Sequence, residues 1–251
     1  MLKLPLRKII FQIFRAKYTP FKKPLLKIEN IKIIQLISNR EPMSNYPKIV
    51  GITGKKRHGK DTLGNYLVEH YGYIRVAFAD AIKDMLRCSF GFSEEQLNGS
   101  EKENADPFWK VSPREVLQFV GTELFRDQMS QLIPNVGSDF WVWIVRKKIL
   151  DILEKNPEAK FVISDVRFPN ELEFIQNIGK ELKGVTTIRV DRPTFNDSTI
   201  GIQHLSETQI ENLKVEHVIL NDSSIEHLYE SLDSIFFLYS IQCFQCFQQK
   251  K

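Results

Sequence analysis

Short apolar runs recur along the sequence and predict the strands of a sheet. The run at residues 48–53 is apolar almost throughout and ends in a glycine-rich turn, which is typical of a buried strand in a parallel sheet. The run at residues 160–164 has the same character. The sequence therefore predicts strands at residues 48–53, 73–78, 160–164, 185–190 and 216–220.

Segments with helical spacing lie between these runs. In residues 61–71, Leu63, Leu67 and Val68 are expected on one face of a helix. The Ser-Pro-Arg-Glu at residues 112–115 predicts a helix start, with the serine as N-cap and the glutamate closing a capping box. We predict helices at residues 61–71, 79–90, 112–131, 139–155, 169–178 and 224–238, and irregular structure at 91–110 and 192–205.

Strands that alternate with helices predict a mainly parallel sheet with helices on both faces. The length of 251 residues suits one α/β domain with an extension. We therefore expect a three-layer α/β/α sandwich at residues 47–240, preceded by an N-terminal extension at 1–46 and followed by a tail at 241–251.

The basic charge of the chain is concentrated in its N-terminal segment. Residues 1–46 hold ten Lys or Arg against two Glu, a net of +8, so the other 205 residues carry −4 of the total of +4. A basic amphipathic stretch can target an organelle or lie on an anionic membrane, but Pro5, Pro20 and Pro24 interrupt any long helix. We favour a dispensable arm, or an upstream start codon with Met43 as the start of the body.

The composition of the body argues against several classes of protein. No uncharged apolar run is long enough to span a bilayer, so we expect no membrane association. The acidic body gives no sign of a groove for nucleic acid. The three cysteines do not make a disulfide framework, and the C-x-x-C at Cys243 and Cys246 lacks further zinc ligands nearby. These features indicate a reducing, cytoplasmic compartment.

Residues 51–62, Gly-Ile-Thr-Gly-Lys-Lys-Arg-His-Gly-Lys-Asp-Thr, carry the main candidate chemistry. Gly54 and Gly59 have the spacing of a phosphate-binding P-loop, in which the backbone approaches the phosphates and its N–H groups point into one concavity. The following helix adds its positive N-terminus, and Lys60 would reach the β- and γ-phosphates of ATP. The segment predicts an ATP-dependent kinase with the P-loop NTPase fold.

One position departs from the usual P-loop pattern, because Asp61 and Thr62 follow the lysine where Ser or Thr is expected. A carboxylate is a hard ligand for Mg²⁺, directly or through water, but it can also cap the helix. Thr62 would supply a hydroxyl ligand or only pack. We assign Mg²⁺, bound as Mg-ATP, to this pair without dividing the role between them.

The interior of the loop is basic. Lys55, Lys56 and Arg57 stand together, which suggests a second anionic group near the ATP phosphates, or only a solvated basic turn. His58 is better interpreted as a spacer than as a catalytic base, because phosphoryl transfer depends on positioning and charge neutralisation more than on proton abstraction.

Four segments, in order, resemble the deoxynucleoside monophosphate kinases of bacteriophages and large DNA viruses. The resemblance extends over about residues 48–238 and does not reach the N-terminal segment; its motifs are specific in combination and weak singly. The segments are the P-loop with its Gly-Lys-Asp-Thr; Phe-Ala-Asp-Ala-Ile-Lys-Asp at 78–84; Ser-Pro-Arg-Glu-Val-Leu-Gln-Phe-Val-Gly-Thr-Glu-Leu at 112–124 with Trp141 and Val142; and Ile-Ser-Asp-Val-Arg-Phe-Pro-Asn-Glu at 163–171, continuing through 188–193 and 204–207.

The resemblance implies a P-loop kinase core with a helical monophosphate-binding region at about residues 79–157 and a mobile lid at about 193–205, and it suggests a homodimer. His204 and Glu207 match a family segment whose role does not follow from the residues. By position, the residues bordering the monophosphate are Lys56, Ile82, Lys83, Arg114, Gly121, Thr122, Trp141, Asp165, Arg167 and Glu171. The ATP- and phosphate-binding residues are Gly54, His58, Gly59, Lys60, Asp61, Thr62 and Arg192.

Elementary chemistry agrees with several of these assignments. Arg114, at a helix start, either holds a phosphate with two N–H groups or is an ordinary surface arginine. Asp165, after an apolar run, either orients Mg²⁺ or its water or hydrogen-bonds the substrate. Arg167 either stabilises the transferring phosphoryl group or pairs with a neighbouring acid, and Arg192 either closes over ATP with the lid or is an ordinary loop arginine. The candidate catalytic residues are Lys60, Asp165 and Arg167.

We therefore predict a kinase that transfers the γ-phosphate of ATP to a deoxynucleoside monophosphate, giving the diphosphate for DNA-precursor synthesis. The P-loop and the Ser-Asp-x-Arg segment also resemble animal phosphomevalonate kinase, and the architecture is shared with dephospho-CoA kinase. A P-loop regulatory ATPase is a third alternative, which the acidic body does not favour. The expected ligands are Mg-ATP and a monophosphate, with no nucleic acid and no membrane.

Overall fold

The structure is a computed structural model that describes residues 46–134, 136–193 and 209–248. Nearly all of the predicted N-terminal extension and of the predicted lid, together with His204 and Glu207, lie outside the described residues. Within the described part of the chain, no helix is both long and apolar enough to cross a membrane.

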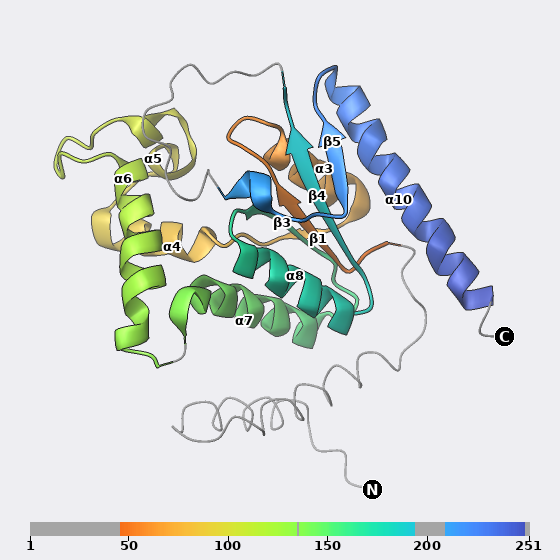
Figure 1. The fold of residues 1–251 in the computed structure, drawn as a ribbon. Coiled ribbons are helices and arrows are strands. Elements are labelled where there is room, and N and C mark those ends of the chain that lie inside the picture. Colours follow the sequence, from red (N-terminus) through yellow and green to blue (C-terminus); the bar gives the residue numbers. More distant parts are fainter. Residues whose placement is uncertain (1–45, 135, 194–208, 249–251) are drawn as a thin grey trace, which may run out of the picture. The chain divides into compact units, whose positions relative to one another are not determined.

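A parallel sheet of five strands forms the centre of the fold (Figure 1). Every neighbouring pair runs parallel, which confirms the predicted sheet. β1 lies in the middle of the sheet. The segment that follows β1 therefore lies at the centre of the edge that the carboxyl ends of the strands form. In spatial order the strands are β2 (Ile74–Arg75), β3 (Phe161–Val166), β1 (Ile49–Thr53), β4 (Val185–Asp191) and β5 (His217–Leu220).

Two strands differ from their predicted bounds. β2 has two residues, although residues 73–78 were expected. The backbone N–H groups of Ala77, Phe78 and Ala79 donate to the carboxylates of Asp80 and Asp165, so they are not available to a neighbouring strand. β3 continues through Val166. Asp165 therefore lies within the strand rather than after it.

Helices cover both faces of the sheet, which confirms the three-layer sandwich (Figure 1). α3 (Lys60–Tyr71) and α10 (Ile225–Gln248) pack on one face, and α7 (Phe140–Lys155) and α8 (Pro169–Glu181) pack on the other. α10 continues ten residues beyond its predicted end at 238.

Successive residues of β1 supply the two cores. Ile49 belongs to the core under α7 and α8, whereas Val50 belongs to the core under α3 and α10. On α3, Leu63 and Leu67 are fully buried, as predicted. Val68 was expected on the same face but is 37% exposed. Five residues after Leu63, its side chain has turned about 140° away around the helix.

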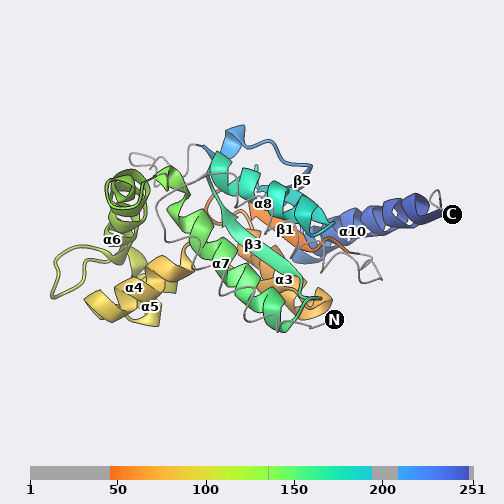
Figure 2. The same cartoon turned by 90° about the horizontal axis from the view of Figure 1, so that it is seen from below.

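The remaining helices gather on the opposite side of the domain from α10 (Figure 2). Residues 91–110, predicted to be irregular, contain α5 and a 3-10 helix, and the capping box of Ser93 and Gln96 is the signal that was missed. Residues 112–131 are helical, and the predicted capping box is present, but an α-helical start passes into a π-helix. The elements are α4 (Asp80–Phe90), α5 (Glu94–Asn98), a 3-10 helix (Ser100–Glu103), α6 (Pro113–Gln118), the π-helix (Phe119–Gln128) and a second 3-10 helix (Met129–Gln131).

Candidate active site

The turn after β1 requires glycine at both predicted positions. Gly54 has φ 148° and Gly59 has φ 105°, in the region that favours glycine. A Cβ on Gly54 would lie 2.5 Å from the carbonyl oxygen of Val190, and one on Gly59 would lie 2.8 Å from Nδ2 of Asn221. The loop is therefore held tightly between the end of β4 and the segment that follows β5.

A cavity of about 310 Å³ lies beside this loop. It brings together five of the predicted ATP-binding residues with residues that follow β5. The P-loop and Arg192 give it a charged part, whereas Ile225 and Leu228 of α10 give it an apolar part. The cavity is lined by Arg57, Gly59, Lys60, Asp61, Thr62, Arg192, Asn221, Ser223, Ile225 and Leu228.

Lys60 is the first residue of α3 and one of the few buried charged residues. Its side chain lines the cavity, and its Nζ donates to the carbonyl oxygen of Lys55 at 3.0 Å. The loop thus holds the ammonium group close to its own backbone, beside the N–H groups of the helix start. This arrangement is suited to binding phosphate oxygens.

His58 connects the P-loop to the end of β4. The backbone N–H of Arg192 donates to Nδ1 of His58 at 3.1 Å, and the carbonyl oxygen of Val190 lies 3.3 Å from the same atom. Burial lowers the pKa of His58, although the Val190 carbonyl and Asp191 favour the protonated ring. Asn221 completes the connection by donating to the carbonyl oxygen of His58 at 2.9 Å.

Asp61 and Thr62 line the cavity in the first turn of α3. Oδ1 of Asp61 lies 3.3 Å from Nη2 of Arg75 and accepts a hydrogen bond from Ser164 Oγ at 3.2 Å. Both partners are side chains, so Asp61 does not act as the helix cap that the sequence left open. The described residues include no group of three or more His, Cys, Asp or Glu that could hold a metal. Mg²⁺ bound through nucleotide phosphates needs only one or two protein oxygens, which this pair can supply.

Lys56 points to a different part of the molecule from Lys60. Its Nζ lies 2.9 Å from Oε1 of Glu103, and the same oxygen accepts from Nε of Arg114 at 3.1 Å and from Nη2 at 2.9 Å. Partial burial would raise the pKa of Glu103, but the hydrogen bonds and charges of Lys56 and Arg114 lower it to about 2. The P-loop and α6 are therefore joined through one carboxylate.

Further cations lie around Glu103 and its partners Lys56 and Arg114. Burial, followed by the charges of Arg114, Lys83 and Arg167, lowers the pKa of Lys102 to about 8. Lys83 Nζ donates to Asn98 Oδ1 at 2.5 Å, which ties α4 to α5. Four predicted monophosphate-binding cations thus lie in one region around Lys102. We call Lys56, Lys83, Lys102, Arg114 and Arg167 the acceptor cluster.

Asp165 organises the start of α4. Its two carboxylate oxygens accept from the backbone N–H groups of Phe78 at 3.1 Å and of Ala79 at 2.9 Å. Burial raises the pKa of Asp165, while these two N–H groups and the charge of Arg167 favour the ionised form. The carboxylate therefore fixes the turn that leads to Ile82 and Lys83.

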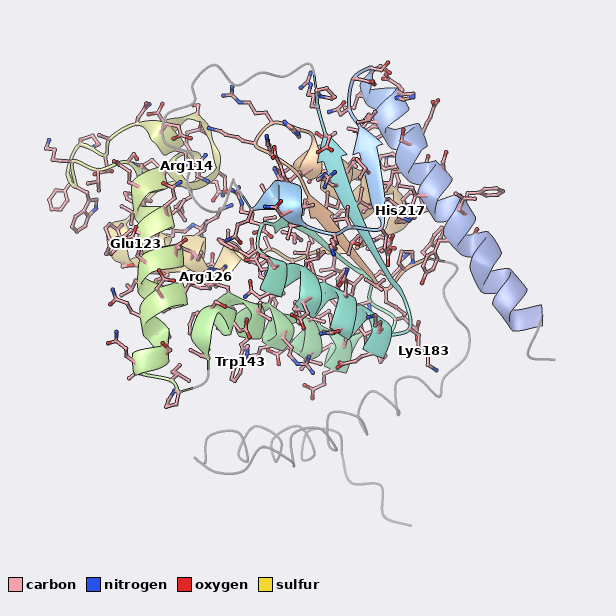
Figure 3. All side chains as sticks on the ribbon, viewed as in Figure 1. Arg114, Glu123, Arg126, Trp143, Lys183 and His217 are labelled. Carbon is pink, nitrogen blue, oxygen red and sulfur yellow. The ribbon has the colours of Figure 1, made fainter. Side chains whose placement is uncertain are left out.

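Glu171 is buried at the start of α8. It accepts from Arg126 Nη2 at 2.7 Å and from the backbone N–H groups of Arg167 at 2.8 Å and of Phe168 at 3.1 Å. Burial raises its pKa to about 7, against the charge of Arg126. The guanidinium of Arg126 also lies 3.8 Å over the ring of Phe168. Arg126 follows Arg114 and Glu123 along the same helical stretch (Figure 3).

Three other predicted residues meet where the π-helix packs against α4 and α7. Trp141 is buried, and its Nε1 donates to the carbonyl oxygen of Gly121 at 2.7 Å. A Cβ on Gly121 would lie 3.0 Å from Cδ1 of Ile82. Thr122 is next in the chain and is partly exposed. The structure thus brings Ile82, Gly121 and Trp141 together, on elements adjoining the acceptor cluster.

Comparison with known proteins decides the family. Residues 48–108 and 94–232 match the family model described as deoxynucleotide monophosphate kinase. This chain belongs to the deoxynucleotide monophosphate kinase family. The matched residues include the P-loop, all of the acceptor cluster and β5. The chain is therefore a nucleotide kinase, and the phosphomevalonate kinase, dephospho-CoA kinase and regulatory ATPase alternatives are not favoured.

Curated relatives agree with this family. The chain is 36% identical over 191 residues to a putative deoxynucleotide monophosphate kinase of Acanthamoeba polyphaga mimivirus, covering 74% of this chain and 94% of the relative. It is 32% identical over 127 residues to the deoxynucleoside-5'-monophosphate kinase of Escherichia phage T5, covering 51% of this chain and 46% of the relative. It is 22% identical to the deoxynucleotide monophosphate kinase of Enterobacteria phage T4, covering 74% of this chain and 97% of the relative.

Several residues that the structure places in or near the site were not predicted from the sequence. Lys102 and Glu103 lie in a polar stretch without periodicity, so no pattern singled them out. Arg126 meets Glu171, which lies 45 residues further along the chain. Asn221 follows the last strand directly, and polar residues at the carboxyl ends of parallel strands are a signal that could have found it.

Proposed function

We propose that this kinase transfers the γ-phosphate of ATP to a deoxynucleoside monophosphate and produces the diphosphate. Membership of the family supports a nucleotide substrate. The observation that carries the proposal is that one loop borders two anion sites. Lys60 lines the cavity beside the start of α3, whereas Lys56 belongs to the acceptor cluster and contacts Glu103. A kinase needs such a pair of sites, because donor and acceptor phosphates must meet.

The cavity is the proposed ATP site. Its charged part, with Lys60 and the N–H groups of the helix start, would receive the phosphates, and its apolar part at Ile225 and Leu228 would receive the base. Asp61 and Thr62 would hold Mg²⁺ through oxygen ligands. When bound, the ion neutralises phosphate charge during transfer.

The acceptor cluster is the proposed monophosphate site. Arg114 presents two N–H groups on one edge of its guanidinium, the geometry that suits a phosphate. Lys83, Lys102 and Arg167 add positive charge nearby. Ile82, Gly121 and Trp141 lie on the adjoining elements, where they would border the nucleoside.

The chemical step follows from this arrangement. An oxygen of the acceptor phosphate attacks the γ-phosphorus of ATP, the bond to the β-phosphate oxygen breaks, and ADP leaves. The transition state spreads negative charge over the transferred group, so positioning and charge stabilisation suffice. Lys60 and Arg167 supply that stabilisation. Asp165 acts as a positioning residue, since it holds the start of α4.

The proposal includes two features taken from the family resemblance, a lid and a homodimer, and one taken from the cysteine content, a cytoplasmic location. Residues 193–205 close as a lid over ATP, beginning beside Arg192, which lines the cavity. The enzyme forms a homodimer, and it works in the cytoplasm. Closure of the lid would exclude water that otherwise hydrolyses ATP.

A coupled assay of ADP formation tests the proposed reaction. The purified chain is given Mg-ATP with a panel of deoxynucleoside and ribonucleoside monophosphates, phosphomevalonate, dephospho-CoA or DNA. We expect a deoxynucleoside monophosphate to give the fastest ADP formation. If no monophosphate stimulates ADP formation, or if phosphomevalonate or dephospho-CoA does so best, the proposed acceptor is wrong.

A further inference from the structure

Glu103 occupies the edge of Arg114 that a phosphate would need. One oxygen of its carboxylate accepts from Nε and Nη2 of Arg114 at 3.1 and 2.9 Å, and it lies 2.9 Å from Nζ of Lys56. Nε and Nη2 form the side of a guanidinium that binds carboxylates and phosphates with two parallel hydrogen bonds. A monophosphate bound there must replace the carboxylate.

The positive charges around Glu103 favour a carboxylate at this position. Burial lowers the pKa of Lys102 most, the charges of Arg114, Lys83 and Arg167 lower it further, and the charge of Glu103 opposes them. Cations gathered for a dianionic substrate repel one another when the substrate is absent. Glu103 offsets part of this repulsion and keeps Lys56 and Arg114 in place.

The local structure allows the carboxylate to leave. Glu103 is the last residue of a four-residue 3-10 helix, and its side chain is 52% exposed. The side chain of Arg114 is 21% exposed and begins in the first turn of a capped helix. Rotation of Glu103 into solvent would free the guanidinium edge without moving Arg114.

We propose that Glu103 is a resident counter-anion of the acceptor-phosphate site, which the phosphate of the substrate displaces. The inference rests on the proposed function for the identity of the substrate. A dianionic phosphoryl group competes well against a single carboxylate, whereas a weak monoanion does not. Glu103 thereby sets a threshold for anion binding and lowers the affinity for the acceptor.

A permanent tie between the P-loop and α6 is the alternative role for Glu103, and the two roles predict opposite results. If Glu103 competes with the phosphate, removing its charge strengthens phosphate binding. If Glu103 only aligns Lys56 and Arg114, removing its charge weakens phosphate binding. The sign of the change in affinity therefore separates them.

The test compares Glu103→Gln with a matched control in the full chain. Glu101→Gln removes the same charge two residues away, where the carboxylate accepts from Asn104 Nδ2 at 2.8 Å. Calorimetric titration with inorganic phosphate measures anion affinity without turnover. Initial rates with the best monophosphate of the panel give the KM values for acceptor and ATP.

For Glu103→Gln we expect phosphate affinity to rise about three- to tenfold, with a similar fall in the acceptor KM, from the loss of two partly exposed ion pairs. The KM for ATP and the Glu101→Gln control should not change. Adding Arg114→Ala to Glu103→Gln should abolish the gain, which locates the bound phosphate.

An unchanged or weaker phosphate affinity in Glu103→Gln would overturn the inference. So would a gain that survives the addition of Arg114→Ala. The phosphate titration needs no catalysis, so it decides the role of Glu103 even if the panel shows that the acceptor of this kinase has been misidentified. Conversely, turnover of deoxynucleoside monophosphates with no gain in Glu103→Gln would leave the proposed function intact.

Discussion

At the scale of single residues, the cations of the P-loop differ in what they contact. Lys60 is buried and lines the cavity, whereas Lys56 is partly exposed and reaches Glu103 and, through it, Arg114. The two lysines stand four positions apart in the sequence, and under the proposed function they would bind different anions. Replacing each should therefore affect a different substrate.

Lys60→Met should reduce kcat by a factor of about 100 to 1,000 or more, because a positive charge aimed at the transferred phosphate is lost. The fold should remain intact, since methionine fills most of the same space. Lys180→Met, an exposed lysine near the end of α8, is the matched control. Rates come from the coupled assay, and circular dichroism and thermal unfolding check the fold. Near-normal turnover would refute the P-loop assignment.

Arg114→Ala should raise the KM for the monophosphate about ten- to a hundredfold, because charged hydrogen bonds to the phosphate are lost. The KM for ATP should stay within about twofold of its value in the unmodified enzyme. Arg87→Ala is the control, since Arg87 pairs with Asp84 and Glu94 on the surface of the same region. An effect confined to the KM for ATP would show that Arg114 does not bind the monophosphate.

At the scale of elements, the start of α8 is fixed to the π-helix by a buried ion pair. Arg126 donates to Glu171, and it also donates to the carbonyl oxygen of Ser138 at 3.1 Å. Glu171 accepts from the backbone N–H of Arg167 as well, so the pair sets the position of a proposed catalytic side chain. The prediction that Glu171 borders the monophosphate is compatible with such an indirect role.

Glu171→Ala should destabilise the protein by about 3–5 kcal/mol, because it leaves Arg126 charged and unpaired in a buried site. The double replacement Arg126→Met with Glu171→Leu should cost less than the single one, since no buried charge remains. Urea unfolding followed by circular dichroism measures both. A loss below about 1 kcal/mol for Glu171→Ala would contradict a structural role for the pair.

At the scale of the whole molecule, the sequence predicts the parallel sheet, the P-loop and most helices, because these follow from local patterns. Val68 was misplaced because a run of apolar residues does not show where a helix face ends. Glu103 and Lys102 were not found because a polar surface stretch has no periodicity. Glu103 meets Lys56, which lies 47 residues away along the chain. Lys102 lies near Arg114, Lys83 and Arg167, so only the tertiary structure brings these groups together.

A variant that begins at Met43 should fold and keep kinase activity, because the P-loop, the cavity and the acceptor cluster all follow that residue. We expect kcat and both KM values within about twofold of those of the full chain. Thermal unfolding and the coupled assay compare the two proteins side by side. Loss of folding or of activity would show that residues 1–42 are required.

Transfer of a radioactive γ-phosphate from ATP to a deoxynucleoside monophosphate is the direct test of the proposed reaction. The enzyme is incubated with labelled ATP, Mg²⁺ and the acceptor, and the products are separated by chromatography. We expect the label in the β-phosphate of the deoxynucleoside diphosphate, and we expect Lys60→Met to prevent its appearance there. Release of the label only as inorganic phosphate, with none in the diphosphate, would contradict it.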